Sequence, residues 1–176
     1  MSGSLLPSQV PKPSALPGLG IATVQFGLSF VAAFFTGKEG GLEYAAAADL
    51  KLVLLALAAY IFVLYALIFR QGLGKNVLNP KLVTSEDPVC QRHFKNLNRS
   101  VENTLEQAPI FLAALFPYAG LVNPVLAGKL VLAYLAFLIP YPMWFPSDRM
   151  LVSTMPRYFI IKYMVASVVI AALRTY

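Results

Sequence analysis

Four long runs of apolar residues constrain the fold of this chain more than any other feature. They cover Leu50–Phe69, Ala108–Val122, Val125–Ile139 and Phe159–Leu173. A run of about 20 apolar residues matches the hydrocarbon thickness of a bilayer, where a helix satisfies every backbone hydrogen bond within its own segment. The second run reaches that length if the polar segment from Arg99 belongs to the same helix. The sequence therefore predicts an all-α, multi-pass integral membrane protein, with a four-helix bundle over residues 44–176.

The composition agrees with a membrane protein and excludes several classes of site. Hydrophobic residues make up 58% of the chain and charged residues only 12%, which is unusual for a water-soluble domain of this size. The single Cys90 excludes an intrachain disulfide framework, and the single His93 provides no zinc or iron spacing. We therefore expect no metal site. Gly72-Leu-Gly74 lacks the strand-to-helix context of a phosphate-binding loop.

A fifth apolar run precedes the bundle and predicts an N-terminal hydrophobic helix over residues 19–36. The run Leu19–Phe35 contains Gln25, Gly27 and Ser29, so a spanning helix and a helix lying at the membrane interface both remain open. The Pro- and Ser-rich leader, 1–18, is expected to be flexible. Its weak positive charge and the poor cleavage site after Phe35 favour retention of the segment over removal as a signal peptide.

Positive charge is concentrated between the first two strong helices. The cations are Arg70, Lys75, Lys81, Arg92, Lys95 and Arg99. Between Arg70 and Arg99, the acidic residues are only Glu86 and Asp87. By the positive-inside rule, the predicted 70–99 loop is cytoplasmic, and the second helix should begin near Phe94. These cations are not interleaved with aromatic residues on a solvated face, so we expect no nucleic-acid partner. An endoplasmic reticulum or other organellar membrane and a bacterial inner membrane remain open.

Polar residues form a stripe at the mouth of the second helix. At roughly 100° per residue, they fall on one arc of about 140°; they are Arg99, Glu102, Asn103, Glu106 and Gln107. Ionisable groups at this depth are expensive and commonly mark a site. Arg99 offers a planar fork for a carboxylate, and the two amides both donate and accept. With Arg70 and Tyr141 at the cytoplasmic ends of their helices, the stripe predicts a pocket for a small anionic ligand, open to lipid.

A simpler interpretation of the same residues also remains open. Arg99 and Glu102 have the spacing of a helix-surface ion pair, which stabilises by a few tenths of a kcal/mol. Asn103 and Glu106 would hold neighbouring helices or subunits together. Tyr141 would anchor the interface beside Trp144.

The second helix resembles the signature of the MAPEG family, the membrane-associated proteins of eicosanoid and glutathione metabolism. The matching pattern is Arg99-x-x-x-Asn103-x-x-Glu106-x-x-Pro109, followed by Phe111-Leu-Ala and Gly120. The resemblance implies a four-helix subunit that forms a homotrimer and binds glutathione between adjacent subunits near the cytoplasmic side. It also implies glutathione-binding roles for Arg70, Arg99, Asn103 and Glu106, with Gln107 at a position that is often Tyr.

The third helix departs from the family pattern, which identifies the chain as a divergent member. Many members have Arg-x-x-Tyr-x-x-x-Tyr, whereas this chain has Leu138-x-x-Tyr141-x-x-x-Phe145. In catalytic members, an arginine near the start of the fourth helix is thought to stabilise the glutathione thiolate. The candidates here are Arg149 in the preceding loop and Arg157, which is expected to open that helix. Tyr141 completes the predicted catalytic set.

Two functions follow from this resemblance. The first is a membrane-bound glutathione-dependent transferase or peroxidase, acting on lipophilic electrophiles or lipid hydroperoxides that arrive from the surrounding lipids. The alternative is a non-catalytic scaffold of the same fold, a lipid-binding protein or an accessory subunit of a larger membrane complex.

Overall fold

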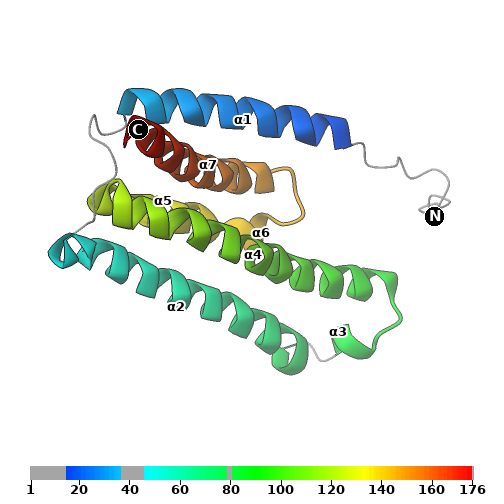
Figure 1. Cartoon of the computed structure of the whole chain (residues 1–176). Coiled ribbons are helices and arrows are strands. Elements are labelled where there is room, and N and C mark those ends of the chain that lie inside the picture. The colour runs from blue at the N-terminus through cyan, green and yellow to red at the C-terminus, as the bar shows by residue number, and fades with distance from the viewer. Residues whose placement is uncertain (1–14, 37–45, 79–80, 176) are drawn as a thin grey trace.

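The computed structural model describes residues 15–36, 46–78 and 81–175, and these residues form helices and short connections without a strand. In chain order the elements are α1 (Ala15–Thr36), the 3-10 helix η2 (Ala47–Leu50), α2 (Lys51–Leu73), the π-helical turn η3 (Gly74–Leu78), α3 (Lys81–Thr84), α4 (Pro88–Leu121), α5 (Pro124–Leu138), α6 (Tyr141–Trp144) and α7 (Met150–Thr175). Figure 1 shows the long helices lying alongside one another. The all-α class is confirmed.

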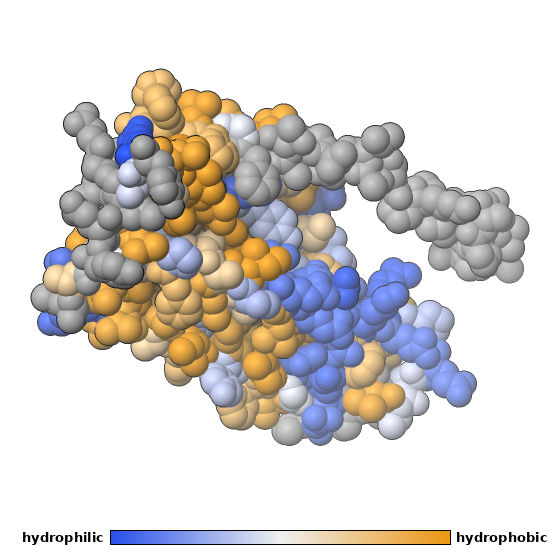
Figure 2. Space-filling view, in the orientation of Figure 1, coloured by the Kyte–Doolittle hydropathy of each residue, from blue (hydrophilic) through white to orange (hydrophobic). Residues whose placement is uncertain are grey.

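Three helical stretches are long and apolar enough to cross a membrane, and they are Lys51–Asn76, Pro124–Trp144 and Met150–Thr175. Their outer faces expose large apolar side chains, including Phe62 and Phe69 of α2 and Leu173 of α7. Water-soluble monomers rarely expose such continuous apolar surface. Figure 2 shows hydrophobic residues over most of the visible body, with hydrophilic residues gathered where α3 and the start of α4 lie. The protein is therefore an integral membrane protein.

Side-chain caps explain where α4 and α5 begin. The Asp87 carboxylate accepts a hydrogen bond from the Val89 backbone N–H at 2.8 Å, and Pro88 occupies the first turn. Asn123 accepts from the Leu126 N–H at 2.9 Å, again with proline in the first turn. Both are favoured arrangements at helix starts. The cap at Asp87 starts α4 earlier than the predicted position near Phe94.

The segment predicted as a 70–99 loop is largely helical, which corrects that expectation. Residues 70–99 include the end of α2, η3, α3 and the first part of α4. Two side-chain hydrogen bonds join this region to α4: Gln71 at the end of α2 and Lys75 of η3 both donate to Asn98 Oδ1, at 2.9 and 2.8 Å. These long-range contacts stabilise helical backbone in a polar segment whose composition suggested a loop.

Two other helices also begin earlier than predicted. α7 begins at Met150 rather than at Arg157, so Pro156 lies inside the helix. Its first turns pack on α5, where Ser153 Oγ donates to the Phe137 carbonyl. α1 begins at Ala15 and includes the end of the predicted leader. The rest of that leader, residues 1–14, lies outside the described residues.

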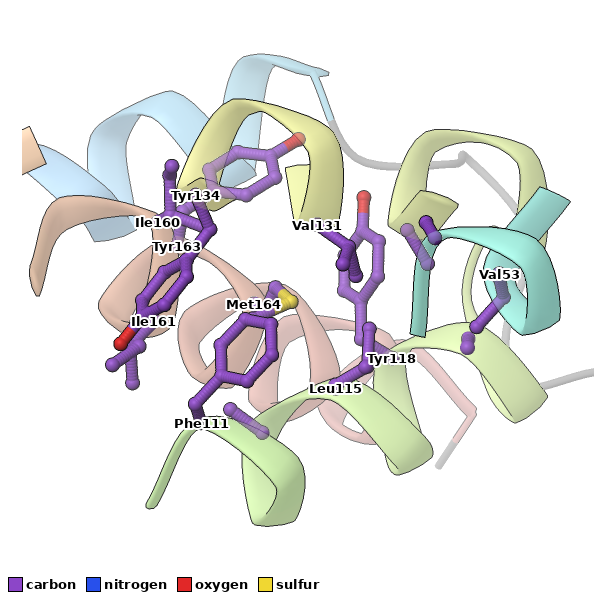
Figure 3. Packing of buried hydrophobic residues seen from close by; sticks show 14 of the residues in the cluster. Val53, Phe111, Leu115, Tyr118, Val131, Tyr134, Ile160, Ile161, Tyr163 and Met164 are labelled. Atoms are coloured by element: carbon purple, nitrogen blue, oxygen red, sulfur yellow. The ribbon is translucent and has the colours of Figure 1, made fainter. Parts of the chain in front are cut away.

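An aromatic cluster joins α2, α4 and α5 at the centre of the bundle. Phe111 of α4 and Tyr134 of α5 stack with their ring centroids 4.2 Å apart, and Tyr60 of α2 lies 4.9 Å from Phe111. Met164 of α7 is fully buried beside them, as Figure 3 shows. Close approach of α2 to α5 depends on Gly128, since a Cβ there would lie 2.5 Å from a side-chain carbon of Leu52.

α1 is the predicted additional hydrophobic helix, and it packs lengthwise on α7 (Figure 1). Gln25 Nε2 donates to Met155 Sδ at 3.0 Å, and Lys162 Nζ donates to Gln25 Oε1. Thr36 Oγ1 and Tyr163 Oη share a hydrogen bond of 2.7 Å. These polar contacts between two apolar helices fix the register of α1 on the bundle.

Candidate functional site

The centre of the candidate site is a buried arginine on α7. Arg157 is only 3% exposed, and its guanidinium carbon lies 4.5 Å from the ring centroid of Tyr141 and 5.7 Å from that of Tyr134. Its Nε donates to the Ser153 carbonyl, one helical turn earlier, at 3.2 Å. In the part of the chain that the structure describes, no carboxylate is within ion-pair distance of Arg157. The site therefore contains a desolvated cation whose described neighbours are aromatic rings and one backbone carbonyl.

Tyr141 covers this cation from the short helix α6. It is 4% exposed, and its hydroxyl accepts a hydrogen bond of 3.0 Å from Asn103 Nδ2 on α4. Pro140 and Pro142 flank it at the start of α6, which contacts both α4 and α7, and the Tyr141 ring lies over Arg157. A phenol that accepts a hydrogen bond keeps its own O–H for donation. The structure thus brings together three predicted site residues, Asn103, Tyr141 and Arg157.

A groove of about 390 Å³ lies on the other side of α6. It is lined by Arg70, His93, Asn96, Leu97, Ser100, Pro142, Phe145 and Pro146. The Phe145 ring packs 5.8 Å from the Tyr141 ring, so the groove adjoins the covered cation. Arg70, at the end of α2, is exposed and places a second positive charge at this groove.

Within the described ranges, the side chains of the other stripe residues form no hydrogen bond or ion pair with the three side chains that meet at α6. Arg99 forms ion pairs of 3.4 Å with both Glu102 and Glu106, and all three side chains are more than half exposed. Gln107 is half-buried. The sequence predicted one continuous face, but the structure divides it between an exposed ion-pair cluster and Asn103, which contacts α6. Only Asn103 of the five residues has a side-chain hydrogen bond to α6.

The two arginine candidates of the fourth helix have different environments. Arg149 is exposed in the turn between α6 and α7, where its carbonyl accepts from the Val152 N–H at 3.1 Å. Arg157 instead lies under Tyr141. The sequence did not distinguish Arg149 from Arg157 as the thiolate-stabilising residue, because spacing does not reveal which side of α7 is covered by α6.

Sequence reasoning missed Tyr134, Ser153 and His93 as members of this site. Tyr134 precedes Tyr141 by seven residues, and Ser153 precedes Arg157 by one helical turn. These i, i+7 and i, i+4 spacings are the signals that were available in the sequence. The Ser153 spacing was hidden because Arg157 was expected to open the helix.

Among residues 15–36, 46–78 and 81–175, no three His, Cys, Asp or Glu side chains form a cluster suited to a metal ion. The site offers cations, a phenol and amides, which are groups that bind an anion.

Comparison with known proteins identifies the fold. Searches of curated proteins and of solved structures found no match. The family model of the MAPEG family matches residues 50–174 and thus includes α2, α4, α5 and α7, while α1 precedes the match. The sequence resemblance in the second helix is therefore confirmed, and the chain belongs to the MAPEG family.

Proposed function

We propose that this protein is a membrane-bound glutathione-dependent transferase or peroxidase that acts on lipophilic substrates. Family membership supports the glutathione association in general. The observation that favours catalysis is Arg157, a buried guanidinium with aromatic neighbours and no carboxylate partner among the described residues. A desolvated positive charge stabilises an anion far more strongly than an exposed one does.

Glutathione would be held near the cytoplasmic side by cations and amides. Arg70, at the groove beside α6, suits a glutathione carboxylate. Asn103 orients the Tyr141 hydroxyl, and Gln107 lies one turn deeper on α4. Arg99 and Glu106 face out of the subunit, so they would reach the peptide from an adjacent subunit of a homotrimer. This assignment makes the site incomplete in one chain.

The thiolate would form beside Tyr141. The Tyr141 O–H would donate to the sulfur, and Arg157 beneath the ring would stabilise the negative charge that spreads toward the phenol oxygen. The thiol proton leaves to water. The sulfur then attacks an electrophilic carbon; a C–S bond forms, and the leaving group departs with its electron pair.

A lipid hydroperoxide would be reduced at the same sulfur. The thiolate attacks the terminal peroxide oxygen, the O–O bond breaks, and the lipid alkoxide takes a proton to become an alcohol. A second glutathione thiolate then attacks the resulting sulfenic acid, which gives glutathione disulfide and hydroxide, and the hydroxide takes a proton to become water. Both substrates are apolar, which agrees with the large apolar side chains exposed around the bundle.

The alternative is a non-catalytic scaffold or lipid-binding subunit of the same fold. It is favoured by Leu138 and Phe145, which replace the arginine and the second tyrosine of many family members. Phe145 lines the groove beside α6, and its ring offers no hydroxyl to a ligand. Glutathione binding separates the two functions.

The decisive experiment measures melting temperature in detergent at increasing glutathione concentration for the wild type and two matched variants. We expect glutathione to raise the melting temperature of the wild type by mass action. Bound wild-type protein should also show the ultraviolet absorbance of a thiolate at neutral pH. Arg157→Gln should lose this absorbance, and Arg149→Gln should keep it. No glutathione response in folded wild-type protein would overturn the proposal and favour the scaffold.

A further inference from the structure

Arg157 belongs to a column of aromatic residues that continues beyond the candidate site. The guanidinium carbon lies 4.5 Å from the ring centroid of Tyr141 and 5.7 Å from that of Tyr134. The ring of Tyr134 lies 6.0 Å from that of Tyr60 on α2. The column therefore connects α6, α7, α5 and α2, and the family resemblance assigned no role to its inner end.

Tyr60 is unusual because its hydroxyl has no hydrogen-bond partner. The residue is 1% exposed, and its ring packs 4.9 Å from Phe111. Among the described residues, its Oη is the one fully buried side-chain nitrogen or oxygen that lacks a partner within the protein. Native proteins rarely leave a buried hydroxyl unpaired because its lost hydration is not replaced. Phenylalanine would fill the same space without this cost, so the hydroxyl requires an explanation.

Tyr134 connects Tyr60 to the charged part of the column, because its ring lies 6.0 Å from the Tyr60 ring and 5.7 Å from the Arg157 guanidinium carbon. The Arg157 guanidinium has five N–H donors, and its Nε donates to the Ser153 carbonyl. Donors therefore remain on the two terminal nitrogens. A water between these groups would have polar partners on three side chains, which is typical of an ordered internal water.

We propose that Tyr60 is a positioning residue for Arg157, and that its hydroxyl reaches the guanidinium through one internal water. Tyr141 lies over one side of the guanidinium, and the water would fix the other side through Tyr60 and Tyr134. Tyr60, on α2, would then determine the distance between the Arg157 guanidinium and the Tyr141 ring. This inference rests on the proposed function because the effect of Arg157 is read at the glutathione thiol.

The test uses full-length protein in detergent with bound glutathione, and it compares Tyr60→Phe with the wild type. The substitution keeps the ring that packs on Phe111 and removes only the hydroxyl. Tyr118→Phe is the matched control, because Tyr118 is equally buried but packs on Tyr163 at 6.0 Å, away from Arg157. The readout is the pH at which half of the bound thiol is ionised, followed by thiolate absorbance.

We expect Tyr60→Phe to raise this midpoint by about 0.5–1 pH unit, a three- to tenfold loss of thiolate affinity for the site. Tyr118→Phe should leave the midpoint unchanged. An unchanged midpoint in Tyr60→Phe would overturn this inference but not the proposed function. If the melting temperature of that variant also rose, the Tyr60 hydroxyl would be a buried group without any hydrogen-bond partner. Equal shifts in both variants would also overturn it. Wild-type protein without any thiolate absorbance would overturn the proposed function and the inference together.

Discussion

Arg99 and Arg157 show how two arginines near one membrane surface acquire opposite properties. Arg99 lies on the outer face of α4, is about half exposed, and has two carboxylates at 3.4 Å. Arg157 lies inside the bundle, is 3% exposed, and contacts aromatic rings and one backbone carbonyl. The sequence motif identifies the first arginine, whereas only the packing of α6 on α7 distinguishes the second.

The difference teaches that burial, rather than the number of charged neighbours, determines which arginine can stabilise a reactive anion. Solvent and two acids already compensate the charge of Arg99, so a further anion gains little from it. Arg157 has lost its hydration without gaining a carboxylate. A buried charge in this state destabilises the empty protein and favours an anionic ligand strongly. Four substitutions test this comparison.

The largest effect is expected for Arg157→Gln, which removes the buried charge. We expect the glutathione-dependent rate to fall by about 10²–10³-fold, as for the loss of one preorganised electrostatic group. The melting temperature of the ligand-free protein should stay the same or rise, because an uncompensated charge is removed. Conjugation of glutathione to a lipophilic aryl halide provides the rate. Arg157→Lys, which keeps the charge, should retain more activity than Gln, and equal rates in wild type and Arg157→Gln would remove Arg157 from the mechanism.

Tyr141→Phe should have the next largest effect. The ring would still cover Arg157, but the hydroxyl that accepts from Asn103 at 3.0 Å would be lost. We expect about a tenfold lower rate, which corresponds to one hydrogen bond of about 1.4 kcal/mol. A double-mutant cycle with Asn103→Ala should give a coupling of about 0.5–1.5 kcal/mol in unfolding free energy. Additive effects would show that the contact contributes nothing to stability.

Arg99→Gln should have a smaller effect, and one of a different kind. Its exposed ion pairs with Glu102 and Glu106 predict a change in unfolding free energy within about 0.5 kcal/mol, and less at high salt. If Arg99 meets glutathione from an adjacent subunit, KM for glutathione should rise about fivefold, for about 1 kcal/mol of binding, with kcat nearly unchanged. Steady-state kinetics at two salt concentrations measures both. A large fall in kcat would show that Arg99 acts on the chemical step, as proposed for Arg157, and would contradict the difference between the two arginines.

Arg149→Gln should have the smallest effect. The side chain is exposed in the turn before α7, so we expect changes within about 0.5 kcal/mol in stability and about twofold in rate. The same thermal and kinetic assays apply. A tenfold fall in rate would transfer the thiolate-stabilising role from Arg157 to Arg149.

Particular elements show how far the sequence alone was informative. The apolar runs predicted the long helices, and the Asn123-Pro124 turn was placed correctly, because capping and proline act locally. The start of α4 was predicted too late, and the segment before Phe94 was expected to be a loop, although η3, α3 and the first turns of α4 are helical. The hydrogen bonds from Gln71 and Lys75 to Asn98 that stabilise this region join residues 27 and 23 positions apart, so no local pattern reveals them.

The candidate site divides in the same way. Asn103, Tyr141 and Arg157 were each named from sequence, but their contact was not predicted. Tyr60 and Tyr134 were not named at all, because tyrosines within apolar runs are indistinguishable from core residues until their neighbours are known.

The sequence by itself determined that this chain is a helical membrane protein of the MAPEG family, since hydrophobicity, helix caps and the α4 motif are properties of short segments. The tertiary structure alone decided which face of α4 meets α6, which arginine is desolvated, and that Tyr60 packs against Phe111 and Tyr134. Those properties depend on packing between distant segments, where a rotation of one helix by a single residue, about 100°, exchanges a buried cation for an exposed one.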